Sequence, residues 1–127
     1  MKLRLLLTPL CCLLALACLA QKPKATDSVM ITIFLKHQQN KNLDSLQAIQ
    51  KQHKFGALFP PAGARVVSWY VMMGIGQVVT VKIPADDLRT LNTAIEKGAW
   101  GAFDTEFYPT YDYMPFWKDE QKKVSGQ

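Results

Sequence analysis

The chain has 127 residues, 15 basic against 10 acidic side chains, and a formal net charge of +5. This length supports one domain with a single core. Without Lys2 and Arg4 near the start of the chain, 13 basic side chains remain (15 minus 2) and the net charge is +3, which is too mild to indicate nucleic-acid binding, so we expect no nucleic-acid partner. After residue 20 no apolar run reaches the ~18 residues needed to span a bilayer, so we also expect no membrane span.

Residues 1–20 have the pattern of a secretory signal peptide, with a basic start, an apolar run and small residues near the end. Cleavage after Ala20 would leave 107 residues (127 minus 20) beginning at Gln21. The pattern predicts export, to a periplasm or out of the cell. In an alternative reading, cleavage occurs before Cys18, and a lipid on that cysteine anchors the domain.

All three cysteines, Cys11, Cys12 and Cys18, fall within this N-terminal segment. An exported domain without them has no disulfide, although export usually leads to an oxidising compartment. It also has no thiol nucleophile and no thiolate ligand for a metal. We therefore expect a domain that is held together by its core and by a partner subunit.

A polar linker, residues 21–28, precedes the first predicted element. Val29–Lys36 is rich in β-branched residues and apolar on both faces, which predicts a strand covered on both sides. A helix is then expected from Leu43, with Asn42 as its N-terminal cap and Gly56 at its end.

The middle of the chain predicts a hairpin. Two apolar strands, Arg65–Met73 and Gln77–Ile83, are separated by a short glycine turn. Simple alternation along the first strand places Val66 on the same face as Tyr70, and Trp69 on the opposite face.

A second helix is expected over Asp86–Lys97. Acidic residues occupy its first turn, where the helix dipole favours them. Leu88, Leu91 and Ile95 recur at helical spacing and predict its buried stripe, and Gly98 is expected to end it.

An aromatic, alternating segment near Thr105–Tyr111 predicts the last strand, and Pro109 indicates an edge or a bulge there. The folded domain is expected over residues 29–116 and a disordered tail over residues 117–127. The order β-α-β-β-α-β predicts an α+β, ferredoxin-like fold, with a four-stranded antiparallel sheet and both helices on one face.

In that plan the second face of the sheet is bare, and here it would carry large apolar side chains. Such a patch exceeds the few hundred Å² that a monomer usually exposes. We therefore expect a homodimer in which two sheets pack together. About half of the following set would lie on this face: Met30, Phe34, Trp69 or Tyr70, Met72 or Met73, and several tyrosines.

The stretch Val66–Tyr113 resembles the dimeric α+β barrel superfamily and is most similar to muconolactone isomerase-type proteins. The similar features are the strand ending at Gly74, the hairpin strand ending in Lys82–Ala85, the helix Asp86–Lys97 and the aromatic strand after it. The resemblance implies a barrel formed between subunits and a small ligand pocket in each. The isomerase's basic and histidine-bearing pattern is missing, so the fold is expected to carry over and the activity is not.

Three residues are candidates for acid–base catalysis: His37, Tyr70 and Glu106. His37 follows the first strand, whose end can open on a pocket, and a half-buried Glu106 would have a raised pKa suited to proton transfer. The competing interpretation is a solvated His37, an interface role for Tyr70 and a solvent-facing Glu106. His53 is interpreted as a surface residue.

Four aromatic residues are candidates for lining an apolar ligand site. They are Trp69, Trp100, Phe103 and Tyr108. The alternative for them is a place in the core or in the dimer interface. The sequence contains no nucleotide-binding loop, and His37 and His53 have no metal-ligand spacing, so we expect neither a cofactor nor a metal.

Three functions remain open at this point. The first is an exported protein that binds a hydrophobic or aromatic small molecule without chemistry. The second is a cofactor-free enzyme of the isomerase or monooxygenase kind that works by proton transfer. The third is a structural dimer module whose aromatic residues serve only the interface. Because no clustered acid–base set is visible, the sequence favours a role without catalysis.

Overall fold

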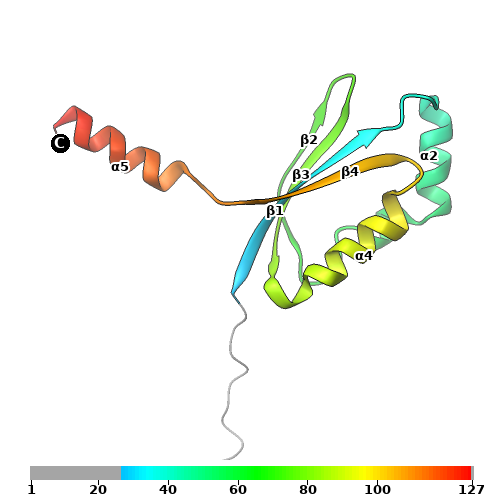
Figure 1. Cartoon of the computed structure of the whole chain (residues 1–127), viewed down its shortest axis with the longest axis horizontal. Helices are drawn as coiled ribbons and strands as arrows, with labels where there is room; N and C mark the ends of the chain where they lie inside the picture. Colours follow the sequence, from blue (N-terminus) through cyan, green and yellow to red (C-terminus); the bar gives the residue numbers. More distant parts are fainter. Residues whose placement is uncertain (1–26, 127) are drawn as a thin grey trace, which may run out of the picture.

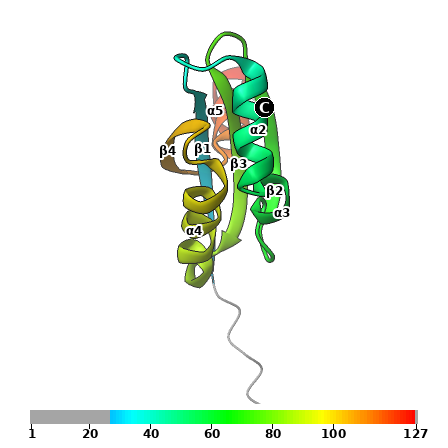
Figure 2. The same cartoon turned by 90° about the vertical axis from the view of Figure 1, so that its right-hand side faces the viewer.

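The computed structural model describes residues 27–126, which form an α+β fold in two layers (Figure 1). One layer is a four-stranded antiparallel sheet with the strand order β2-β3-β1-β4. Helices α2 and α4 form the other layer (Figure 2). The arrangement is compatible with the predicted ferredoxin-like plan. The predicted signal peptide and Cys18 lie outside the described residues.

The elements follow one another in the predicted order, with two additional short segments and one additional helix. Their bounds are β1 Ser28–His37, α2 Leu43–Gln52, α3 Phe55–Leu58, β2 Arg65–Met72, β3 Gly76–Pro84, a 3-10 turn Ala85–Asp87, α4 Leu88–Ala99, β4 Phe103–Thr110 and α5 Met114–Ser125.

The core lies between the sheet and the helices. Alternate residues of β1 and β3 are buried on this side, as the period of two along a strand requires. The helices contribute Leu46, Leu91 and Ile95, and the short helix α3 contributes Phe55. Leu88 is more exposed than the predicted stripe requires.

Helix α2 begins where the sequence predicts and ends earlier. The Asn42 side chain accepts a hydrogen bond from the backbone N–H of Ser45 at 2.8 Å, which confirms the cap. The prediction that Gly56 ends the helix is wrong. The turn is made by Lys54, which has a φ of 55°, and Gly56 lies inside the following helix α3.

Gly98 is likewise not a helix end, because it lies one residue before the end of α4 and is buried. A Cβ at this position would lie 3.0 Å from Cδ2 of Phe55 and 3.1 Å from its Cα. The absence of a side chain therefore allows α3 and α4 to approach closely. This requirement comes from tertiary packing and leaves no local signal in the sequence.

Strand β2 contains a bulge that simple alternation cannot predict. Its register with β3 shifts between Val66 and Ser68. Val66 pairs with Val81 and packs against the core, so it lies on the Trp69 side of the sheet and not on the Tyr70 side.

Strand β4 is an edge strand, which agrees with Pro109. Beyond it, the structure differs from the disordered tail expected over residues 117–127, because α5 continues to Ser125. Pro115 in the first turn and Gly126 in the left-handed conformation after the last turn are favourable helix ends. Among the described helices, none is both long and apolar enough to cross a membrane.

Candidate functional site

One face of the sheet is uncovered, because α2 and α4 pack on the other face (Figure 2). Side chains directly opposite each other on neighbouring strands share a face. We call this surface the open face. The strand pairing gives it the residues Met30, Thr32, Phe34 and Lys36 of β1, Arg65, Ser68, Tyr70 and Met72 of β2, Val78, Thr80 and Lys82 of β3, and Asp104, Glu106, Tyr108 and Thr110 of β4.

Aromatic and aliphatic side chains run across the middle of the open face. Tyr70 pairs with Val78, Val78 with Phe34, and Phe34 with Glu106. The Phe34 ring meets the Tyr108 ring edge to face, with 5.6 Å between centroids. The Tyr70 side of this row is well exposed. We call Tyr70, Val78, Phe34 and Tyr108 the aromatic strip; apart from Met30 and Met72, the other side chains of the open face are polar.

Three threonines beside the strip bond to one another. The Thr32 hydroxyl lies 2.9 Å from the Thr80 hydroxyl and 3.1 Å from the Thr110 hydroxyl. These hydroxyls are partly buried and need no partner outside the face. A polar group that is already paired costs far less to cover than one that must leave water unpaired.

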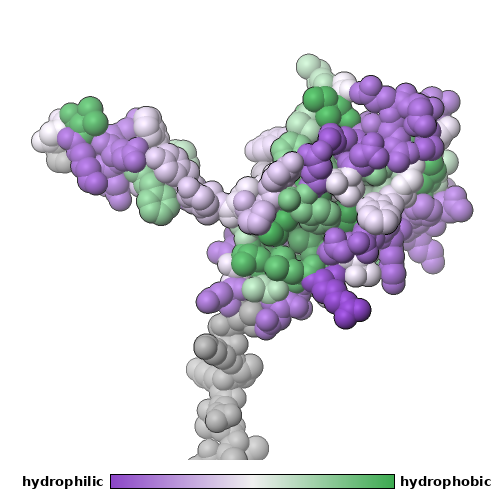
Figure 3. Space-filling model, in the orientation of Figure 1, coloured by the Kyte–Doolittle hydropathy of each residue, from purple (hydrophilic) through white to green (hydrophobic). Residues whose placement is uncertain are grey.

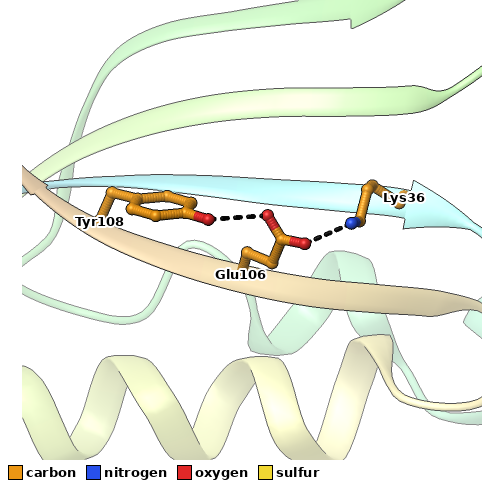
Figure 4. Close-up of polar contacts among 3 residues, drawn as sticks. All are labelled: Lys36, Glu106 and Tyr108. Atoms are coloured by element: carbon orange, nitrogen blue, oxygen red, sulfur yellow. Dashed lines mark hydrogen bonds and ion pairs between the residues drawn. The ribbon is translucent and has the colours of Figure 1, made fainter.

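A second polar chain joins Lys36, Glu106 and Tyr108 (Figure 4). The Lys36 ammonium donates to Glu106 Oε1 in an ion pair, and the Tyr108 hydroxyl donates to Glu106 Oε2 at 2.9 Å. Both carboxylate oxygens are therefore occupied by donors from the same face. About 40% of the Lys36 and Glu106 side chains is exposed.

These contacts decide the charge states. The hydrogen bond from Lys36, and next that from Tyr108, lower the pKa of Glu106 below its ordinary 4.5. The hydrogen bond to Glu106 raises the pKa of Lys36 above 10.5 and that of Tyr108 above 10.0. The prediction of a raised pKa for Glu106 is wrong, because two donors outweigh its partial burial. At neutral pH this carboxylate is a poor proton acceptor.

His37 lies at the end of β1 on the helix side of the sheet, and its ring lies 5.3 Å from that of Phe103. It lines an open depression of about 340 Å³ together with Leu43, Met72 and Ile75. The predicted opening at this strand end is therefore present, as a shallow depression.

The three acid–base candidates are not brought together. Tyr70 and Glu106 share the open face, but their strands β2 and β4 are the two outer strands, about 14 Å apart across three strand spacings. His37 lies on the other side of the sheet. The described geometry contains no cluster in which these groups act on one substrate.

The ligand-wall candidates are also dispersed. Phe103 is 2% exposed and belongs to the core, so it lines no accessible cavity. Trp69 packs on Phe59 on the helix side, and its Nε1 donates to Gln77 at 2.6 Å. Trp100 is exposed beyond α4, and only Tyr108 lies on the open face.

His53, interpreted as a surface residue, is partly exposed, and its Nδ1 lies 3.1 Å from the Trp100 carbonyl oxygen. In residues 27–126 no group of three or more histidine, cysteine or acidic side chains is placed to hold a metal ion.

Lys36 and the threonine trio are the participants that sequence reasoning missed. Alternation along β1 already puts Thr32 and Lys36 on one face, which is a usable signal. Their partners lie 48 to 78 residues away in the chain, and the pairing register that joins them is not visible locally.

Comparisons with protein-family models, with curated proteins and with solved structures each found no match to this chain. The similarity to muconolactone isomerase-type proteins therefore stays a prediction. The α+β architecture and the antiparallel sheet rest on the structure itself.

Proposed function

We propose that this protein is an exported, non-catalytic homodimeric module whose two copies pack open face to open face. The observation that carries the proposal is the composition of the open face. Its aromatic strip is available for contact, while Thr32, Thr80 and Thr110, and likewise Lys36, Glu106 and Tyr108, satisfy one another. A face of this kind can be covered without leaving its central polar groups unpaired.

Packing of two such sheets would bury the strip at a spacing of about 10 Å, as in other face-to-face sheet pairs. In this proposal a small hydrophobic or aromatic molecule would bind in the depression beside His37. Met72 belongs both to that depression and to the open face, whereas His37, Leu43 and Ile75 lie outside the open face, so a dimer would leave most of the depression uncovered.

Two neighbouring residues of β2 provide a matched test. Tyr70 is 67% exposed on the open face, and Val71 is 72% exposed on the other side of the same strand. Neither side chain supports the core, so Tyr70→Lys and Val71→Lys should both fold. A buried unpaired charge is costly at an interface, so Tyr70→Lys should weaken the dimer at least about 30-fold.

The dissociation constants are measured by sedimentation equilibrium, and folding is checked by circular dichroism. Val71→Lys should dimerise like the wild type. Equal dissociation constants for the two variants would contradict an interface on the open face.

A further inference from the structure

Helix α5 and the residue before it, Tyr113, carry an exposed apolar stripe, and Figure 3 shows apolar side chains beside hydrophilic ones on this helix. Tyr113, Phe116 and Trp117 are 49%, 57% and 46% exposed, and α5 contains no buried residue. Two of these rings stack on each other, with 6.0 Å between the centroids of Tyr113 and Phe116. The stripe is therefore formed within the arm, which we define as residues 111–125.

A helix of this length is not expected to be stable in isolation. Helices shorter than about 12–15 residues are marginal in water, and most helical stability comes from packing an apolar face. Helix α5 has 12 residues and an amphipathic sequence. Its stripe needs a surface to pack on.

The position of the arm indicates which surface that is. In Figures 1 and 2, α5 extends from the end of β4 on the side of the sheet opposite α2 and α4, and it stands away from its own domain. The open face of the sheet is on this same side. A second copy packed on the open face would occupy the space beside the arm.

The dimensions agree with this arrangement. Twelve residues at a rise of 1.5 Å give a helix about 18 Å long, comparable with the ~14 Å between the outer strands of a four-stranded sheet. Aromatic side chains carry ~150–250 Å² each, so three that are half exposed would add roughly 300 Å² per copy. That is a substantial share of the ~800 Å² per partner in a stable interface.

The charges of the arm favour a protein surface over a lipid surface. Lys118, Lys122 and Lys123 are balanced in part by Asp119, which pairs with Lys122 at 3.7 Å. Glu120 lies on the stripe itself and accepts a hydrogen bond from the Tyr113 hydroxyl at 3.1 Å. A helix that binds anionic membranes presents a cleanly basic polar face and an uninterrupted apolar one.

We infer that in the dimer the arm of each copy packs on the surface of the second copy, with Tyr113, Phe116 and Trp117 in contact with it. This inference rests on the proposed function, because it takes the open face as the dimer interface. It adds a second contact region, supplied by residues outside the two-layer domain.

The test compares two double variants of the chain that lacks residues 1–20. The stripe variant, Phe116→Ser with Trp117→Ser, removes two of the three aromatic rings of the stripe, and the lysine variant, Lys118→Ser with Lys122→Ser, alters the opposite side of the same helix. Each dimer contains two arms, so the stripe variant should raise the dissociation constant about 100-fold, as expected when aromatic anchors are lost. The lysine variant should stay within about threefold of the wild type.

The outcomes separate the two claims. If the wild type dimerises and the stripe variant has the same dissociation constant, the arm inference is wrong and the open-face dimer is unaffected. A wild-type monomer at every concentration overturns the proposed function as well. A third measurement tests binding to vesicles that contain phosphatidylglycerol. If they bind the wild type but not the stripe variant, while both dimerise equally, the arm is a membrane contact and the inference fails.

Discussion

Glu106 shows how neighbouring side chains set the chemistry of a single carboxylate. Exposure alone would leave its pKa near the ordinary 4.5, and burial alone would raise it. Lys36 and Tyr108 instead occupy both oxygens and hold the pKa below 4.5. The residue that the sequence suggests as a proton acceptor is thereby fixed as a structural anion.

This arrangement predicts a pH dependence with a definite sign. A group whose pKa is lower in the folded state than in the unfolded chain stabilises the fold above its unfolded pKa. The stabilisation is lost as the pH falls through the folded pKa. The melting temperature of Glu106→Gln should therefore lie below that of the wild type at pH 7, and the difference should shrink steadily below about pH 4.5.

The control for removing a carboxylate is Glu96→Gln on the exposed side of α4, where the glutamate accepts a hydrogen bond from Asn92. The melting temperature of Glu96→Gln should not show the pH-dependent difference from the wild type that is expected for Glu106→Gln. An NMR titration gives the second measurement, and a carboxyl pKa for Glu106 at or above 4.5 would contradict the described contacts.

At the scale of elements, local chemistry was enough to predict every strand and both long helices of the two-layer domain. The Asn42 cap and the apolar run of β1 are examples, because each depends only on neighbouring residues. The role of Gly98, in contrast, depends on a residue that is distant in the chain. Gly56 and Gly98 look alike in sequence as helix ends, yet one is exposed within α3 and the other is pressed against Phe55.

These two glycines provide a test of the contact between α3 and α4. Gly98→Ala should lower the free energy of unfolding by about 1–3 kcal/mol, because the new methyl group collides with Phe55. Gly56→Ala has no atom within 4 Å of the new Cβ and should raise the free energy by up to about 1 kcal/mol through helix propensity. Denaturant unfolding measures both, and equal effects would show that the close approach is absent.

Helix α5 was not predicted because most of its residues are polar and because it lies close to a terminus, where disorder is common. The signals for it were present in Pro115, the Lys and Glu side chains and Gly126. An unpacked helix and a disordered tail have similar sequences, and what distinguishes them is a surface to pack on.

At the scale of the whole molecule, the sequence predicted a bare sheet face and the structure has one. Alternation correctly put Tyr70 opposite Trp69, and Glu106 on the same side as Tyr108. It could not bring Lys36 to Glu106 or Thr32 to Thr80, since strand pairing decides those contacts. The candidate site was thus predictable as a face and not as a set of contacts.

The open face also connects the remaining observations. Its aromatic strip and its internally paired polar groups are suited to being covered, and the arm extends on the same side. Packing of two copies would help to stabilise a domain that has no cysteine after residue 20 and so no disulfide there, which matters most if the chain is exported as residues 1–20 predict.

The most direct test of the open-face dimer is the mass of the chain without residues 1–20 in solution. Sedimentation equilibrium over nanomolar to high micromolar concentrations should give twice the chain mass at the upper end and a reversible fall toward one chain mass on dilution. A single-chain mass at every concentration would contradict the account.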